Sequence, residues 1–383
     1  MDKTPVVALL VDSRTRYGRT ILQGIARYIR THSPWNCFVG SEPVEGFPRG
    51  LRQWSGDGII ATLHHAEAAD QLRSFRVPVV NVANRRDIPG IPTVACDDVA
   101  IGRLGAEHFL ERGFRNLAFF GLPEDHYSIQ RRQGFLDRCA QEQGVEATAF
   151  RHPPLVREDW AAWRRDAAAW VRTLPTPIGV MACDDNQGRT LLAVCHSLGL
   201  RVPEDVAILG VDNDDVYCEL CMPPLSSIEP AGEVRGYESA ALLAKLMDGE
   251  SPPQEPIRVP PRSVVVRQSS DVLELDDAEV AAALRYIRRN SHRPISVSDL
   301  LEEVPISRKS LELRFARAIG RLPGEEIRRA HLERAKTLLT ETDYPLEDVA
   351  RGAGLRSAKT LCDIFRRYLD KTPSEYRREH YMR

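Results

Sequence analysis

The sequence of 383 residues has little of what a secreted or membrane protein requires. Its first apolar run, residues 6–11, is shorter than the apolar core of a secretory signal, and no stretch approaches the ~18 uninterrupted apolar residues of a membrane span. The 8 cysteines are sparse and lie mostly in apolar runs, as reduced core thiols do, so a disulfide framework is excluded. We therefore expect a cytoplasmic protein without membrane contact.

Catalytic and metal-binding motifs are also missing. We find no GxSxG, HExxH or GxxxxGK[ST] motif, and no GxGxxG after the first apolar run. Cys218 and Cys221 form a single CxxC without a second pair of ligands, which leaves zinc or redox use as a minor alternative. Asp184-Asp185-Asn186 could suggest magnesium, but adjacent side chains point to different places. We expect no catalytic residue, no metal and no cofactor.

A large excess of one charge is absent from the chain as a whole, yet the charge is unevenly spread. The net charge is −2, and apolar residues make up 43% of the sequence, so a disordered chain is excluded. Residues 277–383 carry a net charge of +5, whereas the preceding residues carry −7. This polarity predicts an acidic body and a basic tail that could contact nucleic acid.

The body alternates short apolar runs with amphipathic stretches. Continuous, β-rich runs predict strands buried on both faces, at residues 6–11, 58–61, 78–82, 117–121, 178–182, 206–211 and 262–267. Helical periods lie between them, at residues 20–30, 101–112, 131–143, 184–198 and 234–247. Gly113, Gly144 and Gly199 follow three of these helices as expected C-caps. The alternation predicts an α/β domain with parallel sheets flanked by helices.

Polar residues stand where the predicted strands end, which is the edge at which such sheets bind ligands. They are Asp12-Ser13-Arg14, Asn84-Arg85-Arg86, Asp97-Asp98, Asp184-Asp185 and Asp212-Asn213. Carboxylates and arginines recognise hydroxyl groups, and an aromatic ring such as Tyr17 or Tyr127 can cover the apolar face of a sugar. The alternative is that individual carboxylates only cap the following helices, which Asp97 and Asp184 could do. As a set, these clusters predict a sugar site.

The order of these motifs resembles the sugar-responsive domain of LacI/GalR-type repressors. The resemblance rests on PTVACDDVAIGRLGAEHFLERGFRNLAFFGLP, RRQGF, PIGVMACDDNQGRTLLAVCHSLGLRVPEDVAILGVDN and PPLSSI. It implies a two-lobed periplasmic-binding-protein-like fold over residues 1–270, with crossovers between lobes near residues 95–100, 224–230 and 253–260. Those repressors carry a helix-turn-helix before the first strand. Here that strand begins at Val6, so a DNA-binding element must lie elsewhere.

The same resemblance implies roles for individual residues. Arg131 matches the arginine that grips the sugar, and Asp212 matches a strand-end aspartate that contacts the ligand. Asp184 and Asp185 match a strand-end Asn-Asp pair, with Asp184 in place of the usual Asn. Asp97 matches a further strand-end aspartate. Together with the strand-end residues, the expected ligand contacts are Asp12, Tyr17, Asp97, Arg131, Asp184, Asp185, Asp212 and Asn213.

Beyond an expected linker at residues 271–277, the tail is helical throughout. Ser296 with Asp299 and Ser307 are expected helix caps, and Pro345 and Pro373 stand where helices begin. Residues 296–318 and 345–368 have the proportions of helix-turn-helix units. A helix at about residues 324–342 joins them and spans ~28 Å, so two recognition helices could reach successive major grooves on one face of DNA. A bundle that binds nothing is the alternative.

The tail, residues 278–383, resembles the AraC/XylS-type DNA-binding domain, most specifically in PLEDVARGAGLRSAKTLCDIFRRYLDKTPSEYRRE. That resemblance implies base-edge contacts from the second helix of each unit. The residues so implied are Lys309 and Glu312 in the first unit, and Ala358, Lys359, Cys362 and Asp363 in the second. Ser307, Arg308 and Arg356 are expected beside them. Arg308, Arg314, Arg356, Arg366 and Arg367 are expected to position phosphates or to pack as stems.

A LacI-like domain placed ahead of an AraC-like tail resembles the xylose-operon regulators over essentially the whole chain. The resemblance implies a homodimer that binds D-xylose and DNA half-sites and, as an activator, RNA polymerase. We predict a sugar-responsive transcription regulator, an activator of pentose catabolism genes. The alternatives are a repressor, a regulator that responds to another sugar or polyol, a cytosolic sugar-binding protein and a sugar-modifying enzyme.

Overall fold

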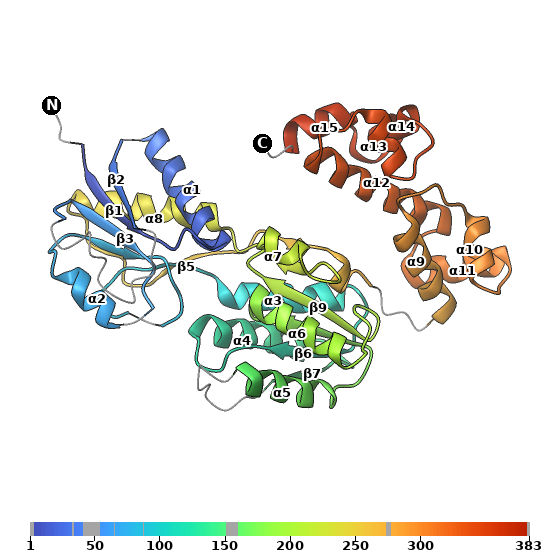
Figure 1. Ribbon diagram of the computed structural model, residues 1–383, viewed down its shortest axis with the longest axis horizontal. Helices are drawn as coiled ribbons and strands as arrows, with labels where there is room; N and C mark the ends of the chain where they lie inside the picture. Colours follow the sequence, from blue (N-terminus) through green and yellow to red (C-terminus); the bar gives the residue numbers. More distant parts are fainter. Residues whose placement is uncertain are drawn as a thin grey trace. The chain divides into compact units, whose positions relative to one another are not determined.

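The computed structural model describes residues 4–32, 34–40, 54–64, 66–86, 88–150, 160–272 and 277–380. The chain divides into two compact units, Met1–Val272 and Leu273–Arg383, and the boundary falls inside the expected linker (Figure 1). The first unit contains parallel sheets covered by helices, and the second is helical. The predicted fold class, α/β followed by all-α, is confirmed.

The first lobe of the α/β unit is a four-stranded parallel sheet in the order β2-β1-β3-β4. Its strands are β1 (Val6–Leu10), β2 (Asn36–Gly40), β3 (Gly58–Ala61) and β4 (Val79–Asn81). Helices α1 (Arg16–Thr31) and α8 (Gly232–Met247) cover one face, and α2 (Ala66–Arg73) covers the other. Because side chains alternate along a strand, Leu9 packs with α1 and α8 while Leu10 packs with α2.

The second lobe has a six-stranded sheet in the order β12-β10-β9-β8-β6-β7, antiparallel only at β12. The strands are β6 (Asn116–Phe120), β7 (Glu146–Ala149), β8 (Ile178–Ala182), β9 (Val206–Val211), β10 (Ser226–Ile228) and β12 (Val264–Val265). One face packs on α3 (Asp98–Leu110) and α4 (His126–Ala140), the other on α5 (Trp160–Val171) and α6 (Asp185–Ser197). Short helices α7 (Asp215–Glu219) and η2 (Gln268–Ser270) follow β9 and β12.

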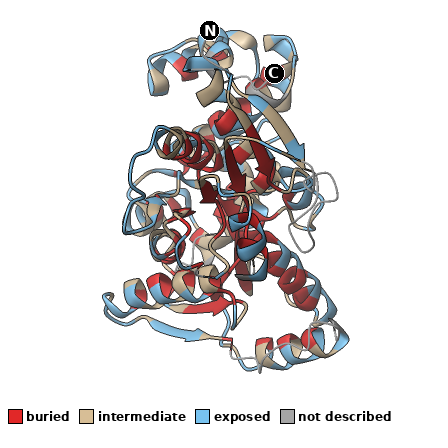
Figure 2. Ribbon diagram, turned by 90° about the vertical axis from the view of Figure 1, so that its left-hand side faces the viewer, coloured by how far each residue is buried: buried red, intermediate tan, exposed pale blue. Residues whose placement is uncertain are grey.

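The chain passes between the lobes three times. It leaves the first lobe after β5 (Val94–Cys96), returns after β10, and leaves again after β11 (Ile257–Val259), which pairs in parallel with β5. The first two crossovers lie at or next to the expected ranges. The third follows Val259 and begins at the end of the expected residues 253–260. Buried residues are concentrated on the strands and on the inner faces of the helices (Figure 2).

Helices α3 and α4 cross at glycines, and this crossing places Arg131. A Cβ at Gly102 would lie 1.9 Å from the carbonyl oxygen of Arg131, and one at Gly134 would lie 2.0 Å from that of Val99. Only glycine allows the two backbones to approach so closely. The expected C-cap glycines Gly113, Gly144 and Gly199 all have positive φ, as a left-handed cap requires.

The second unit contains helices α9 to α15 in two small cores. Their bounds are α9 (Ala278–Asn290), α10 (Val297–Glu303), α11 (Arg308–Ile319), α12 (Pro323–Glu341), α13 (Leu346–Gly352), α14 (Ala358–Leu369) and α15 (Pro373–His380). The 19-residue α12 belongs to both cores, with Ile327 in the first and Leu332, Ala335 and Leu339 in the second. The two helix-turn-helix pairs, α10–α11 and α13–α14, are therefore joined by one continuous helix.

Candidate functional site

A cavity of about 430 Å³ lies between the two lobes of the α/β unit. The first lobe lines it with residues that follow β1, β3 and β4, with Cys96 of β5 and with one residue each of α1 and α8. The second lobe lines it with Asp98 of α3, with α4 and with residues that follow β6, β8 and β9. The strand ends of both sheets thus converge on one space, as is usual for ligand sites in α/β folds. The volume falls in the range of roughly 300–1,000 Å³ that small-molecule sites occupy.

A buried ion pair forms one wall of the cavity. Arg131 is 3% exposed, and its Nε donates to Oδ1 of the fully buried Asp98 at 2.7 Å. Its Nη1 donates to the carbonyl oxygen of Cys183, and its guanidinium carbon lies 4.9 Å from the ring centroid of Tyr127. Burial acts to lower the pKa of Arg131, but Asp98 and Asp212 outweigh it and raise that pKa above its ordinary value. Arg131 therefore enters the cavity as a fixed cation.

Asp184 and Asp185 lie side by side in the chain but serve different purposes. Asp184 is the N-cap of α6, where it accepts from the backbone N–H of Gln187 at 2.8 Å, and it also accepts from the Tyr127 hydroxyl at 3.0 Å. It lines the cavity while it caps, so the two interpretations of this residue are compatible. Burial, followed by the nearby Asp184 charge, raises the pKa of Tyr127, which keeps its hydroxyl protonated as a donor.

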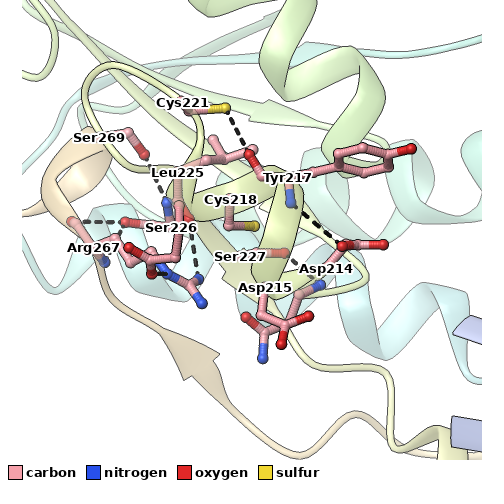
Figure 3. Close-up of polar contacts among 12 residues, drawn as sticks. Asp214, Asp215, Tyr217, Cys218, Cys221, Leu225, Ser226, Ser227, Arg267 and Ser269 are labelled. Atoms are coloured by element: carbon pink, nitrogen blue, oxygen red, sulfur yellow. Dashed lines mark hydrogen bonds and ion pairs between the residues drawn. The ribbon is translucent and has the colours of Figure 1, made fainter. Parts of the chain in front are cut away.

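Asp185 holds the turn that follows β9. Its carboxylate accepts from the Ser227 hydroxyl at 2.6 Å and from the backbone N–H of Asp214 at 2.8 Å, and the Cys218 thiol lies 3.4 Å away. Figure 3 labels these three partners. Burial raises the pKa of Asp185 to about 7 against these hydrogen bonds, which act to lower it. Asp185 lines the cavity, but its carboxylate oxygens already accept hydrogen bonds from the protein, so its contribution is to position the turn.

The positioned turn presents Asp212 to the cavity. Asp212 has φ +111° and Asn213 has φ +48°, a left-handed backbone that non-glycine residues seldom adopt. The carboxylate of Asp212 has no hydrogen-bond partner among the described residues. Burial raises its pKa, and the charge of Arg131 opposes that rise. Asp212 is thus a carboxylate that lines the cavity without a hydrogen bond to the described residues.

Two predicted ligand contacts lie outside the cavity lining. Asp97 is the N-cap of α3 and accepts from the backbone N–H of Ala100 at 2.9 Å, so its neighbour Asp98 faces the cavity instead. Asn213 donates its backbone N–H to Ser227 Oγ at 2.9 Å and supports the turn. The strand-end pattern predicts a cluster at this edge but does not say which of two adjacent residues faces inward.

Asp12 and Tyr17 do line the cavity. Asp12 forms an ion pair with Arg14 at 2.9 Å, and the Tyr17 hydroxyl donates to the carbonyl oxygen of Val82 at 2.9 Å. The ring of Tyr17 therefore faces the cavity while its polar end is already satisfied. This arrangement fits the aromatic role that the sequence predicts for Tyr17.

Polar contacts join the two lobes next to the cavity. Asn84 donates from Nδ2 to the second oxygen of Asp98 at 2.6 Å, Arg85 pairs with Asp125 at 2.9 Å, and Arg16 pairs with Asp215 at 3.2 Å. Each pair has one member in either lobe. The lobes are consequently in contact around the space that a ligand would fill.

Sequence reasoning missed Arg235 and chose Asp97 over Asp98. Arg235 lies on α8 and lines the cavity, although it is only 1% exposed. A signal was present in the sequence: Arg235 falls on the buried face of α8, among the small and apolar residues Gly232, Gly236, Ser239, Ala240 and Leu243. A charged residue on such a face requires a specific partner.

In the second unit, the two recognition-helix candidates have the same local design. Ser307 and Ser357 are the N-caps of α11 and α14, accepting from the backbone N–H groups of Ser310 and Thr360. Four positions further on, Leu311 and Leu361 are both fully buried, and so are Phe315 and Phe365. Lys309 and Lys359 are the second residues of their helices and are exposed. The two units thus present matching surfaces.

The predicted DNA contacts are accessible but differ in their partners. Ser307, Arg308, Lys309, Arg356, Lys359 and Asp363 are exposed, and Glu312, Ala358 and Cys362 are half-buried. Arg308 and Glu312 pair with each other at 3.0 Å along α11. Arg314 forms ion pairs with Asp277 and Glu279 at the start of α9, so its guanidinium already has partners within the unit.

The two units define a class of protein, in which a two-lobed, binding-protein-like domain is joined to a double helix-turn-helix. Comparison with protein families agrees: residues 6–99 match the XylR N-terminal domain, residues 106–270 the periplasmic binding protein-like domain, and residues 300–379 a helix-turn-helix domain. Ligand-responsive transcription regulators are built in this way. Among the described helices, none is long and apolar enough to cross a membrane.

Individual relatives narrow the class to one family. The chain is 31% identical to the xylose operon regulatory protein of Escherichia coli strain K12, covering 97% of this chain and 96% of that protein. It is 30% identical to the protein of the same description from Haemophilus influenzae, covering 97% of each. The solved structure of the xylose-binding transcription activator xylR matches over 100% of both chains, with a TM-score of 0.73 and 30% identity. The chain belongs to the family of xylose operon regulatory proteins.

Proposed function

We propose that this protein is a sugar-responsive transcription regulator that binds a pentose in the cavity between its lobes and binds DNA through its double helix-turn-helix. D-xylose is the first candidate for the pentose. The observation that carries the proposal is the cavity itself, which both the buried Arg131 and the half-buried Asp212 line, in a chain that also carries two capped recognition helices. Arg131 and Asp212 would donate to and accept from sugar hydroxyls, and Tyr17 and Tyr127 would lie against its C–H groups.

The chemistry of the lining favours binding over turnover. Asp184 and Asp185, a candidate acid–base pair by their proximity, are occupied by a helix cap and by the turn after β9. A sugar-modifying enzyme that used this pair would need one of the two free for the substrate. Incubating the protein with D-xylose and recovering it unchanged is the result that a regulator predicts.

A ligand that touches both lobes stabilises the arrangement in which they are in contact, and it shifts that equilibrium only by its differential affinity. In a homodimer, such a shift would change how two tails are presented to DNA half-sites. We propose activation through RNA polymerase, and repression through the same parts is the second candidate. A reporter gene that rises with D-xylose and needs the intact chain supports activation, whereas one that rises on deletion of the gene supports repression.

Sugar identity is tested by a thermal-shift and calorimetric screen of pentoses, hexoses, polyols and sugar acids. D-xylose should raise the melting temperature progressively with its concentration, by about 2–4 °C for each kcal/mol of stabilisation in a unit of this size. If another pentose binds more tightly, the cavity remains the proposed binding site and only the proposed ligand changes. If no sugar binds, the proposal is wrong.

DNA binding is tested through its salt dependence. The logarithm of the affinity should fall linearly with the logarithm of salt concentration, with a slope of about −0.9 per phosphate contact. Replacing both Lys309 and Lys359 with Ala should weaken DNA binding without changing sugar affinity, whereas Lys245→Ala, an exposed lysine of α8, should leave both unchanged. DNA binding that survives removal of residues 278–383 would contradict this assignment.

A further inference from the structure

Arg235 is a buried arginine whose hydrogen-bonding capacity is only partly used. It projects from α8 of the first lobe, is 1% exposed, and lines the cavity. Its Nη1 donates to the Cys96 sulfur at 2.7 Å, and its guanidinium carbon lies 4.0 Å from the ring centroid of Tyr17. Its Nε and Nη2 have no hydrogen-bond partner among the described residues. One side of this guanidinium is therefore satisfied and the other is not.

The unsatisfied side has a specific geometry. Nε–H and the adjacent Nη2–H lie along one edge of the planar guanidinium and form a fork that matches two neighbouring oxygen atoms. Burying a cation with such an edge unpaired is costly, and proteins seldom do so without a use for it. The contrast with Arg131 is informative, because Arg131 is equally buried but donates to Asp98 and to a backbone carbonyl.

The charges around Arg235 indicate what kind of group fits the fork. Asp98 and Asp212, both on the second lobe, act on Arg235 through their charge, but neither accepts a hydrogen bond from it. A hydroxyl between Arg235 and Asp212 can accept from the arginine and donate to the carboxylate at once. A carboxylate ligand could pair with Arg235 but would be repelled by Asp212. The pair therefore selects a neutral polyhydroxyl compound.

We propose that Arg235 is a specificity-determining ligand contact, whose Nε and Nη2 donate to two neighbouring hydroxyls of the sugar. This inference rests on the proposed sugar-binding function and deepens it. Because Arg235 is on the first lobe and Asp212 on the second, a sugar held by both ties the lobes together. Arg235 also touches the crossovers, since Cys96 ends β5 and its thiol lies 3.7 Å from the carbonyl oxygen of Pro230, just before α8.

The test compares Arg235→Met with Arg267→Met. Arg267 is a matched control, because its side chain is 13% exposed and its partners lie outside the cavity. It pairs with Glu219 at 2.6 Å and donates to the carbonyl oxygen of Leu225 at 3.1 Å. Figure 3 shows Arg267 beside Leu225. Titration calorimetry measures D-xylose affinity, and thermal unfolding measures the stability of the sugar-free protein, both on the full chain. A third variant, Arg235→Lys, keeps the positive charge but removes the paired Nε–H and Nη2–H donors.

Arg235→Met should weaken D-xylose binding at least about tenfold, as loss of charged donors does, and leave the sugar-free melting temperature within about 2 °C of wild type or raise it. Arg235→Lys should weaken binding comparably. Arg267→Met should do the reverse. It should lower the melting temperature of the sugar-free protein and leave the D-xylose affinity within about twofold of wild type. Wild-type protein should bind D-xylonate more weakly than D-xylose.

Two outcomes overturn the inference: Arg235→Met that binds D-xylose as tightly as wild type, or Arg235→Met that loses as much sugar-free stability as Arg267→Met. The second outcome would make Arg235 a structural residue. If the wild-type protein binds none of the sugars, the proposed function is wrong. In that case the sugar-free stabilities of Arg235→Met and Arg267→Met show only whether Arg235 is a structural residue.

Discussion

The two walls of the cavity differ in how completely their charges are paired. On the second lobe, Arg131 pairs with Asp98, and Asp184 accepts from Tyr127 and from a helix N-terminus. On the first lobe, Arg235 keeps one edge of its guanidinium without a partner. Across the cavity, Asp212 is the carboxylate left without one among the described residues. The second lobe thus presents a surface on which most charges are paired, and we propose that a ligand completes the contact between Asp212 and the first lobe.

The largest effect on sugar affinity and stability is expected from replacing Arg131, in the wall where the charges are paired. Arg131→Met should reduce D-xylose affinity by more than about 100-fold and also destabilise the sugar-free protein, because removing one partner of a buried pair typically costs about 3–5 kcal/mol. Asp98, 0% exposed, would be left buried without its cation. Calorimetry and thermal unfolding measure both effects. Adding Asp98→Asn should restore part of the stability and none of the binding, and a fully stable Arg131→Met would contradict the comparison.

A smaller effect is expected at Asp212, the unsatisfied residue of the second lobe. Asp212→Asn should weaken D-xylose binding roughly tenfold, since hydrogen bonds to a charged acceptor contribute about 1.5–3 kcal/mol. It should not destabilise the sugar-free protein, because burial disfavours the ionised form and raises the pKa of Asp212. Asp97→Asn is the control, since Asp97 caps α3 outside the cavity lining. A loss of sugar affinity in Asp97→Asn as large as that in Asp212→Asn would restore Asp97 as a ligand contact.

A further effect concerns the support of the turn, and it depends on pH. Burial raises the pKa of Asp185 from 3.8 to about 7, so ionising it disfavours the folded state. This penalty is absent below pH ~4, grows as the pH rises towards 7, and is constant above that. The stability of wild type relative to Asp185→Asn should therefore fall between pH 4 and pH 8. Thermal unfolding across that range checks the sign, and a difference independent of pH would show that Asp185 does not titrate there.

The central strands could be predicted because their burial is continuous. Residues 58–61, 178–182 and 206–211 form strands as predicted. The strands that were missed carry weaker patterns, namely β2, β5, β7, β10 and β11. In β7, EATA is mostly exposed at a sheet edge. In β10, Ser226 and Ser227 are fully buried, and tertiary hydrogen bonds to Arg267 and Asp185 satisfy their hydroxyls. Local sequence shows no apolar signal in such cases.

The helical tail could be predicted more completely, since its signals are local. The capping box of Ser296 with Asp299 and the cap of Ser307 are present, and α9 begins directly after the expected linker. The candidate ligand site depends on which residues meet across two lobes. Whether Asp97 or Asp98 faces inward is decided by where α3 begins, and Arg235 reaches the site only because α8 returns to the first lobe. Neither can be read from spacing along the chain.

The most direct test of this account is a crystal structure of the full-length protein with D-xylose. We predict one sugar in the cavity, with one hydroxyl between Asp212 and Arg235 and a second within about 3.2 Å of the Arg235 fork, and with Arg131 still paired to Asp98. A sugar bound elsewhere, or one that contacts the second lobe alone while the Arg235 fork meets only water, would contradict it.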